Sequence, residues 1–176
     1  KSNQGSITID FALERGENIS TSVLTPAGDP AAGAKVAIGV AGSHISIENG
    51  DLRQGSSRAA FVEADGSGRV KFPPQDGDFH IVVTHPTGYA HVKALSETAP
   101  ESIRLLPWGR IEGVYRMGQK PAPNITLEFD SNAINAPGQN DPSMHASHRV
   151  TTGPDGEFVF ERVFSGRGWL GRQIII

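Results

Sequence analysis

Apolar side chains alternate with polar or small ones along much of the chain. This spacing of two recurs in four separate segments, at residues 7–13, 36–40, 79–83 and 125–129. Successive side chains of a strand point to opposite faces of its sheet, so the pattern predicts strands with one buried face. No stretch has a convincing helical pattern, and residues 45–54 and 133–147 are predicted to be loops. The sequence therefore predicts an all-β protein.

Glycine and proline interrupt this alternation at many points. The 176 residues include 21 Gly and 12 Pro, scattered without a period, which indicates many short strands joined by turns. The stretch TPAGDPAAGAKVAI at 25–38 places four of them before an alternating segment. Pro26 presets φ for a β-turn, Pro30 cannot donate to a sheet ladder, and Gly33 lets the backbone bend. We therefore predict a hairpin connection here rather than a binding loop.

The chain also resembles itself. The segment ISTSVLTPAGDPAAGAKVAI (19–38) is similar to IEGVYRMGQKPAPNITLEF (111–129), and ADGSGRVKF (64–72) is similar to TGPDGEFVF (152–160). Upstream, SITIDFALERGENI precedes the first copy as SIRLLPWGRI precedes the second. The offsets are all close to ninety residues, about the length of one small β-sandwich. This predicts two tandem sandwiches.

The predicted boundaries are 1–107 for the first sandwich and 108–176 for the second. The link Pro107-Trp108-Gly109 is short, and Trp108 is expected to pack the two modules together at a fairly fixed angle. Residues 102–106 are expected to form the closing strand of the first module.

The second module is predicted to be incomplete. It has no counterpart of Gly88-Tyr89-Ala90 or of the strand after them. Residues 7–13 are expected either to close an earlier module or to join the first as an extra strand. We interpret the chain as a piece of a longer protein. A sandwich that lacks a strand exposes a sheet edge, which invites pairing with another chain.

These strings resemble a known family. SVLTPAGDPAAGAKVAI, EADGSGRVKFPP, DFHIVV and GYA are similar to the carboxypeptidase regulatory-like domain, and GVYRMGQKPAPNITLEF with TTGPDGEFVFERVFSG fits the same pattern. The resemblance covers most of the chain. It implies transthyretin-like (prealbumin-like, Ig-like) antiparallel β-sandwiches, which occur in tandem in many bacterial surface and periplasmic proteins.

The same resemblance implies a function. The modules would be non-catalytic spacer, presentation or interaction domains of a larger extracytoplasmic bacterial protein, which is periplasmic, displayed on the cell surface or secreted. Their partners would be other domains of the same polypeptide or another protein. Any binding is expected in the long segments 39–58 and 131–149, because loops carry recognition on such scaffolds.

The composition of the chain excludes several classes of function. The net charge is −3 and Lys and Arg form no cluster, so no nucleic-acid footprint is visible. No apolar run reaches the ~18 residues that a membrane span requires, so membrane insertion is not expected. The chain has no cysteine, which excludes disulfides, thiolate catalysis and Cys-ligated zinc.

Histidine and aspartate offer the candidate metal ligands. His80, His85 and His91 lie on and after one predicted strand, where an odd separation sends His80 and His85 to opposite faces. His145 and His148 have a spacing that is seen in metal sites, in a segment predicted to be a mobile loop. The acidic turns, Asp65-Gly66-Ser67-Gly68 and Asp155-Gly156, lack the further oxygen ligands of a calcium loop and indicate hairpins instead. We therefore predict no metal, cofactor or catalytic residue.

Two alternatives stay open. Intradiol ring-cleavage dioxygenases share the turn-and-strand pattern and bind ferric iron through two Tyr and two His. Tyr89 and Tyr115 match that inventory but fall in different repeats. A carbohydrate-binding module would use an exposed aromatic platform, for which Trp108 and Trp169 are the candidates.

Overall fold

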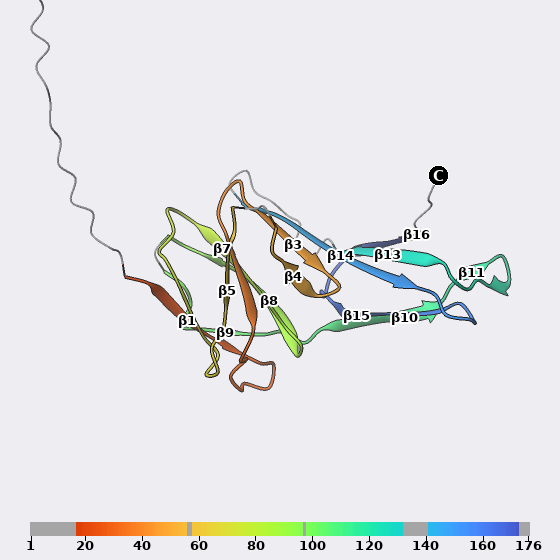
Figure 1. Ribbon diagram of the computed structural model, residues 1–176, viewed down its shortest axis with the longest axis horizontal. Coiled ribbons are helices and arrows are strands. Elements are labelled where there is room, and N and C mark those ends of the chain that lie inside the picture. The colour runs from red at the N-terminus through yellow and green to blue at the C-terminus, as the bar shows by residue number, and fades with distance from the viewer. Residues whose placement is uncertain (1–16, 56–57, 97, 132–140, 173–176) are drawn as a thin grey trace, which may run out of the picture.

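The computed structural model describes residues 17–55, 58–96, 98–131 and 141–172, and these form an all-β, β-sandwich-like structure (Figure 1). The all-β prediction is confirmed. Within the described ranges, no helix is long and apolar enough to cross a membrane. Residues 7–13, residues 132–140 and residues 173–176 lie outside the described residues.

The N-terminal half of the structure comprises the first nine strands. They are β1 (Ile19–Leu24), β2 (Lys35–Gly39), β3 (His44–Glu48), β4 (Asp51–Arg53), β5 (Ala60–Glu63), β6 (Arg69–Phe72), β7 (Phe79–His85), β8 (Gly88–Ala94) and β9 (Ser102–Arg104).

The C-terminal half comprises the remaining seven strands. They are β10 (Gly109–Val114), β11 (Arg116–Met117), β12 (Lys120–Pro121), β13 (Thr126–Ser131), β14 (Ser143–Thr151), β15 (Glu157–Val163) and β16 (Gly168–Arg172).

The strands form layers. In the N-terminal half, the sheet β6-β1-β9 faces the sheet β5-β2-β7-β8 across a core that includes Phe72, Phe79 and Ile81. The five-stranded sheet β16-β13-β14-β3-β4 draws on both halves, and a smaller core that includes Leu127 and Phe160 lies between its C-terminal strands and the pair β10-β15. Most ladders are antiparallel, as predicted, but β1–β9 and β14–β3 are parallel.

Two segments predicted to be loops are strands. Residues 45–54 contain most of β3 and all of β4, and β14 begins at Ser143 inside the segment predicted to be a mobile loop. The predicted long loops 39–58 and 131–149 therefore contain parts of a sheet. Short strands of mixed polarity escape a pattern search because their pairing partner, here on the other half, supplies the stabilising ladder.

The central strands are buried on both faces. In β7, Phe79 and Ile81 enter the core shared with β6-β1-β9, whereas Val82 packs on the other side against strands of the five-stranded sheet. His80 and Thr84 on that second face are also buried. The sequence predicted one buried face. The second face is covered because β3, β4 and β14 lie over it. The alternation of residues within β7 does not reveal this cover.

A tight turn recurs in both halves with the same hydrogen bonds. In the first, the Val23 N–H donates to the Gly68 carbonyl over 2.7 Å, and in the second the Tyr115 N–H donates to the Gly156 carbonyl over 2.8 Å. Gly68 and Gly156 both have φ of +74°. The repeat read from the sequence thus corresponds to a repeated turn geometry.

Alanine at Gly156 is expected to lower the free energy of unfolding by about 2 kcal/mol, since it adds backbone strain and a clash. Its Cβ would lie 2.5 Å from the carbonyl oxygen of Tyr115. Gly118 is the matched control, because its φ is +64° but a Cβ there meets nothing within 4 Å. Urea titrations of G156A and G118A measure the difference. Equal losses would show that the contact with Tyr115 is not restrictive.

Candidate functional site

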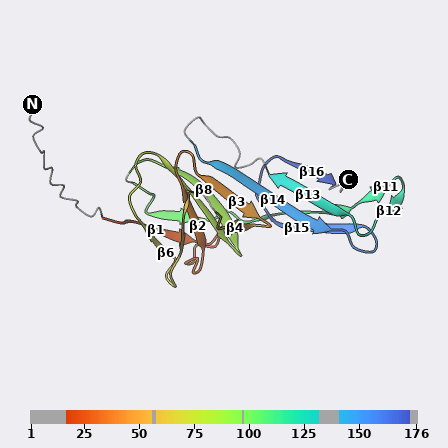
Figure 2. The same ribbon diagram turned by 45° about the horizontal axis from the view of Figure 1, so that its top comes forward.

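The joint, by which we mean the contact between the two halves, is built first from backbone pairing. Strand β3 pairs in parallel with β14, with His44 opposite Ser143 and Glu48 opposite Ser147. Figures 1 and 2 show these strands side by side. Beyond the ladder, the Asn49 N–H donates to the Ser147 carbonyl at 2.9 Å. A sheet that runs without interruption across two halves resists bending between them.

Three aromatic rings fill the joint. Phe164 lies between Tyr89 and Trp108, with ring centroids 4.4 Å and 5.1 Å away, and its side chain is 1% exposed. The Trp108 indole N–H donates to the His85 carbonyl at 2.8 Å, and the Tyr89 hydroxyl accepts the Ser165 N–H at 2.9 Å. Trp108 therefore packs the halves together, as predicted.

A β-bulge adds an ion pair to the joint. The register of β10 and β15 shifts between Gly109 and Ile111, and Arg162 in this region has a left-handed φ of 56°. Such a conformation strains a residue other than glycine. It accompanies a guanidinium that reaches Asp51 of β4 at 3.0 Å. A Cβ on Gly50 would lie 2.6 Å from the Cβ of Arg162, so glycine is needed for this approach.

A polar cluster closes the joint at its other end. His80 of β7 lies 2.8 Å from His91 of β8 and 3.1 Å from the carboxylate of Asp141, just before β14. Lys93 donates to the same carboxylate at 2.9 Å. Hydrogen bonding to Asp141, together with its negative charge, raises the pKa of Lys93. The two halves are thus held together by charge where apolar packing ends.

The direction of the hydrogen bonds in this cluster follows from chemistry. An ionised Asp141 can only accept, so the Nε2 of His80 donates to it and the Nδ1 of a neutral His80 must accept. His91 therefore donates from Nε2 to His80. Both ring nitrogens of the buried His80 are occupied within the protein. A general base needs a nitrogen within reach of a substrate proton, so this geometry favours a structural role.

We expect stability to fall as the pH drops below about 6.5. Burial, followed by the electrostatic interaction with His80, lowers the pKa of His91, and burial likewise lowers the pKa of His148. The unfolded chain then binds more protons than the folded one, so stability is fully present above the unfolded pKa and is lost below it. Urea midpoints at pH 7.5, 6.5 and 5.5 test this. H148Q should flatten the slope and H145Q, at an exposed position, should not. A pH-independent midpoint would contradict the prediction.

Of the candidate histidines, His80 and His91 meet in the polar cluster described above, whereas His80 and His85 diverge, as predicted. His80 is buried, whereas His85 ends β7 and bonds the Thr87 hydroxyl at 2.8 Å. His145 and His148 lie on opposite faces of β14. His145 is 3.5 Å from the carboxylate of Asp130, and His148 is 1% exposed, with its Nε2 donating to the Arg162 carbonyl.

Both acidic segments form tight turns, but the prediction that they are hairpins is wrong, because the strands on either side of each turn, β5 and β6 or β14 and β15, belong to different sheets. One oxygen of Asp65 accepts the Ser67 N–H, the Ser67 hydroxyl and the Arg69 N–H at 2.7 to 3.0 Å. These bonds lower the pKa of Asp65, the Ser67 hydroxyl contributing most. Asp155 donates its backbone N–H to the carboxylate of Glu157 at 2.9 Å. The Asp65 carboxylate therefore stabilises the turn itself.

The aromatic residues considered as iron ligands or as a sugar-binding platform lie in different parts of the structure. Tyr89 belongs to the joint, whereas Tyr115 packs against the core beneath β10 and β15. Trp169 lies on β16 with 59% of its surface exposed. Among the described residues, no group of three or more His, Cys, Asp or Glu side chains is arranged to hold a metal ion.

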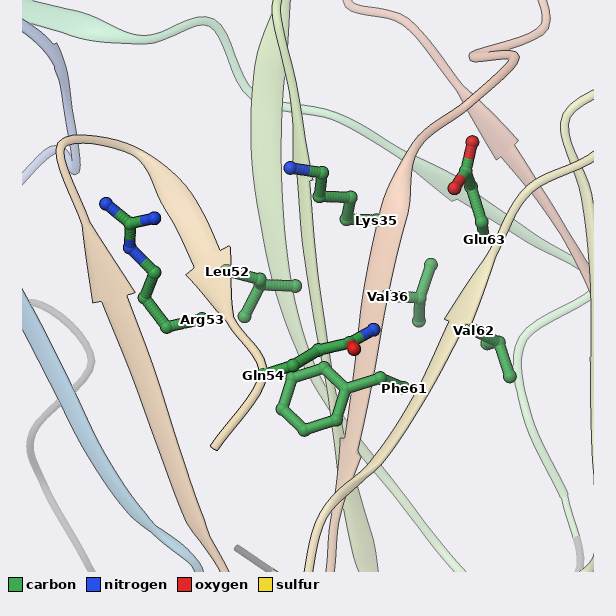
Figure 3. A pocket seen from close by; sticks show the side chains of 8 residues that line it. All are labelled: Lys35, Val36, Leu52, Arg53, Gln54, Phe61, Val62 and Glu63. Carbon is green, nitrogen blue, oxygen red and sulfur yellow. The ribbon is translucent and has the colours of Figure 1, made fainter. Parts of the chain in front are cut away.

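A surface pocket of about 540 Å³ opens beside the joint, between β4 and the β2-β5 edge (Figure 3). Leu52, Val36 and Phe61 form part of its wall, and Lys35 and Arg53 rim it. Each cation has an anionic partner in the protein, since Lys35 is 3.8 Å from Asp51 and Arg53 is 2.8 Å from Glu48. The pocket therefore offers a small mixed surface rather than an uncompensated charge.

Sequence reasoning missed Asp141, Asp51 and Arg162, which hold the joint. The sequence carried a signal only for the contact between His80 and His91. The register of the β7–β8 hairpin places His91 opposite Val82, and therefore next to His80. The chain matches no protein-family model, no curated protein and no solved structure at a significant level.

Proposed function

We propose that the protein is a non-catalytic rigid spacer, two tandem transthyretin-like sandwiches of the carboxypeptidase regulatory-like type that hold other domains or partners at a fixed separation. The first module would span 1–107 and the second, incomplete one 108–176. One observation carries the proposal: the parallel pairing of β3 with β14 makes a single sheet from both halves. A flexible tether would have no such ladder, and an enzyme would not need one.

The rest of the joint supports rigidity. The Phe164 cluster, the Arg162–Asp51 pair and the Asp141 cluster act at separate points along the contact. Several contacts spread over an interface resist rotation better than one. The extracytoplasmic bacterial setting is part of the proposal and is supported by the family resemblance of the sequence.

The two alternatives have less support from the geometry. Iron ligation by two tyrosines would need Tyr89 and Tyr115 in one place, and they lie in different clusters. The Tyr89 hydroxyl also accepts a backbone bond. For carbohydrate binding, Trp108 is occupied in the joint, and Trp169 is the one large aromatic side chain exposed within the described ranges. A screen of Trp169 fluorescence against polysaccharides would test that alternative.

Pulsed electron–electron distance measurements test the spacer proposal. The chain has no cysteine, so K71C and K120C place one spin label on each half without background. Both lysines are exposed. A single narrow distance distribution is expected. W108A should broaden it, whereas W169A should not. A broad or multimodal distribution in the otherwise unaltered chain would overturn the proposal.

A further inference from the structure

One face of the five-stranded sheet, which we call the outer face, points away from the cores. Phe129 of β13 enters the core beneath β10 and β15, so its neighbours Glu128 and Asp130 project from the outer face. This face continues across all the strands of the order β16-β13-β14-β3-β4 (Figure 2). One row of directly opposed residues crosses it: Trp169, Asp130, Ser147, Glu48 and Asp51. The outer face is therefore polar, with an aromatic side chain on β16.

The indole of Trp169 lies along the sheet instead of standing away from it. Gly171 is two residues further along β16 and on the same face. A Cβ at Gly171 would overlap three atoms of the six-membered ring of Trp169, so the indole occupies the space that this glycine leaves. The side chain is nevertheless 59% exposed. An indole held in this way presents a π face of negative potential, which attracts the C–H groups of another ring.

Two ion pairs beside the indole offer hydrogen-bonding groups. Arg149 donates from Nε, over 2.9 Å, and from Nη2 to the same carboxylate oxygen of Glu128. Its other guanidinium N–H groups and the second oxygen of Glu128 are further donors and acceptors. On the other side of Ser147, the Nε2 of His145 is 3.5 Å from the carboxylate of Asp130. The four side chains of these pairs are between 30% and 53% exposed, so a ligand can reach them.

The charges of the outer face compensate one another. Besides the pair of Arg149 with Glu128, Arg53 lies 2.8 Å from Glu48, and Asp51 lies 3.0 Å from Arg162. Local compensation of this kind gives little attraction for a polyanion, whereas the paired groups still donate to and accept from hydroxyl groups. The ligand chemistry that fits the face is therefore uncharged and rich in hydroxyls.

A protein partner fits the outer face less well. Strands β13, β14 and β3 each pair with a strand on both sides, so they offer no free backbone edge for the addition of another strand. The core of a protein interface is also depleted in charged residues. Here Trp169 lies beside charged side chains instead.

The spacing of the strands suits a linear sugar chain. Neighbouring strands lie ~4.8 Å apart, which is close to the length that one pyranose unit adds to a linear glycan. We propose that the outer face of β16, β13 and β14 binds a linear neutral polysaccharide, with one sugar ring stacked on Trp169 and the following units hydrogen-bonded by the two ion pairs. The proposal does not rest on the spacer function, because these three strands all belong to the C-terminal half.

Isothermal titration calorimetry with four neutral hexasaccharides tests the proposal. The probes are cellohexaose, xylohexaose, maltohexaose and N-acetylchitohexaose. At least one should bind the full chain with a dissociation constant below about 1 mM, and W169A should weaken that binding about tenfold or more. D130A should weaken it as well. L170A is the matched control, because Leu170 is the next residue of β16, is 44% exposed and points to the opposite face, so its loss should leave the affinity unchanged.

G171A gives a second readout that keeps the indole in the chain. Its added Cβ displaces the ring of Trp169, so binding should weaken although no ligand-binding group is removed. Circular dichroism checks that each variant folds. The proposal would be wrong if none of the four hexasaccharides bound, or if W169A and L170A bound equally well. Polygalacturonate tests the charge of the ligand. If it bound more tightly than every neutral sugar, and salt abolished that binding, the assignment of an uncharged ligand would be overturned.

Discussion

Replacing Phe164 with alanine is expected to lower the free energy of unfolding by about 3–5 kcal/mol, the usual cost of deleting a fully buried aromatic side chain. Phe164 is 1% exposed and touches the rings of both Tyr89 and Trp108. The cavity would open between the two halves, where backbone pairing on both sides limits collapse. Urea or guanidinium titration followed by circular dichroism measures the loss.

W169A provides the comparison, because it removes a larger aromatic side chain that is 59% exposed. We expect that change to cost less than about 0.5 kcal/mol. Calorimetry of F164A adds a second readout, since a weakened joint lets the halves unfold separately and broadens or splits the thermal transition. If F164A and W169A were equally stable, the aromatic cluster would not be what couples the halves.

Replacing Asp141 with alanine is expected to cost about 3 kcal/mol, because it leaves a buried donor without its acceptor. The side chains of His80 and Asp141 are 7% and 15% exposed, so water compensates little for the lost bond. The ammonium of Lys93 loses the same partner. Denaturant titration at pH 7.5 measures the change.

The chain contains a matched pair at the surface. His145 and Asp130 also form a His–Asp contact, but their side chains are 49% and 41% exposed. D130A should therefore cost less than about 1 kcal/mol, as exposed ion pairs generally do. Similar losses for D141A and D130A would show that burial does not set the strength of the Asp141 cluster.

These variants bear on the spacer proposal in different ways. F164A removes packing, and D141A removes charge, but both leave the backbone pairing of β3 with β14 in place. We therefore expect each to lower stability more than it broadens the distance between the halves. W108A acts on the connection itself, which is why it is the variant chosen for the distance measurement.

The sequence by itself determined the all-β class of the structure and the positions of several of its turns. Alternation at positions such as Val36 and Ile38 predicts strands because side chains on a strand alternate by geometry. The glycines at positions 68 and 156 mark turns. Both have a left-handed backbone conformation, and a Cβ at either position would clash with a neighbouring backbone carbonyl. The role of Trp108 was also predictable, since a large apolar ring in a short link has little else to bury it. These are local consequences of residue type and spacing.

Only the tertiary structure decided how the two halves meet. Strands β3 and β4 carry too weak a pattern to be recognised alone, and they exist as strands because β14 supplies a ladder roughly one hundred residues later in the chain. The burial of His80 and its bond to Asp141 depend on that same long-range pairing. Contacts between residues far apart in sequence leave no local periodicity, so the joint could be found only once the chain was folded.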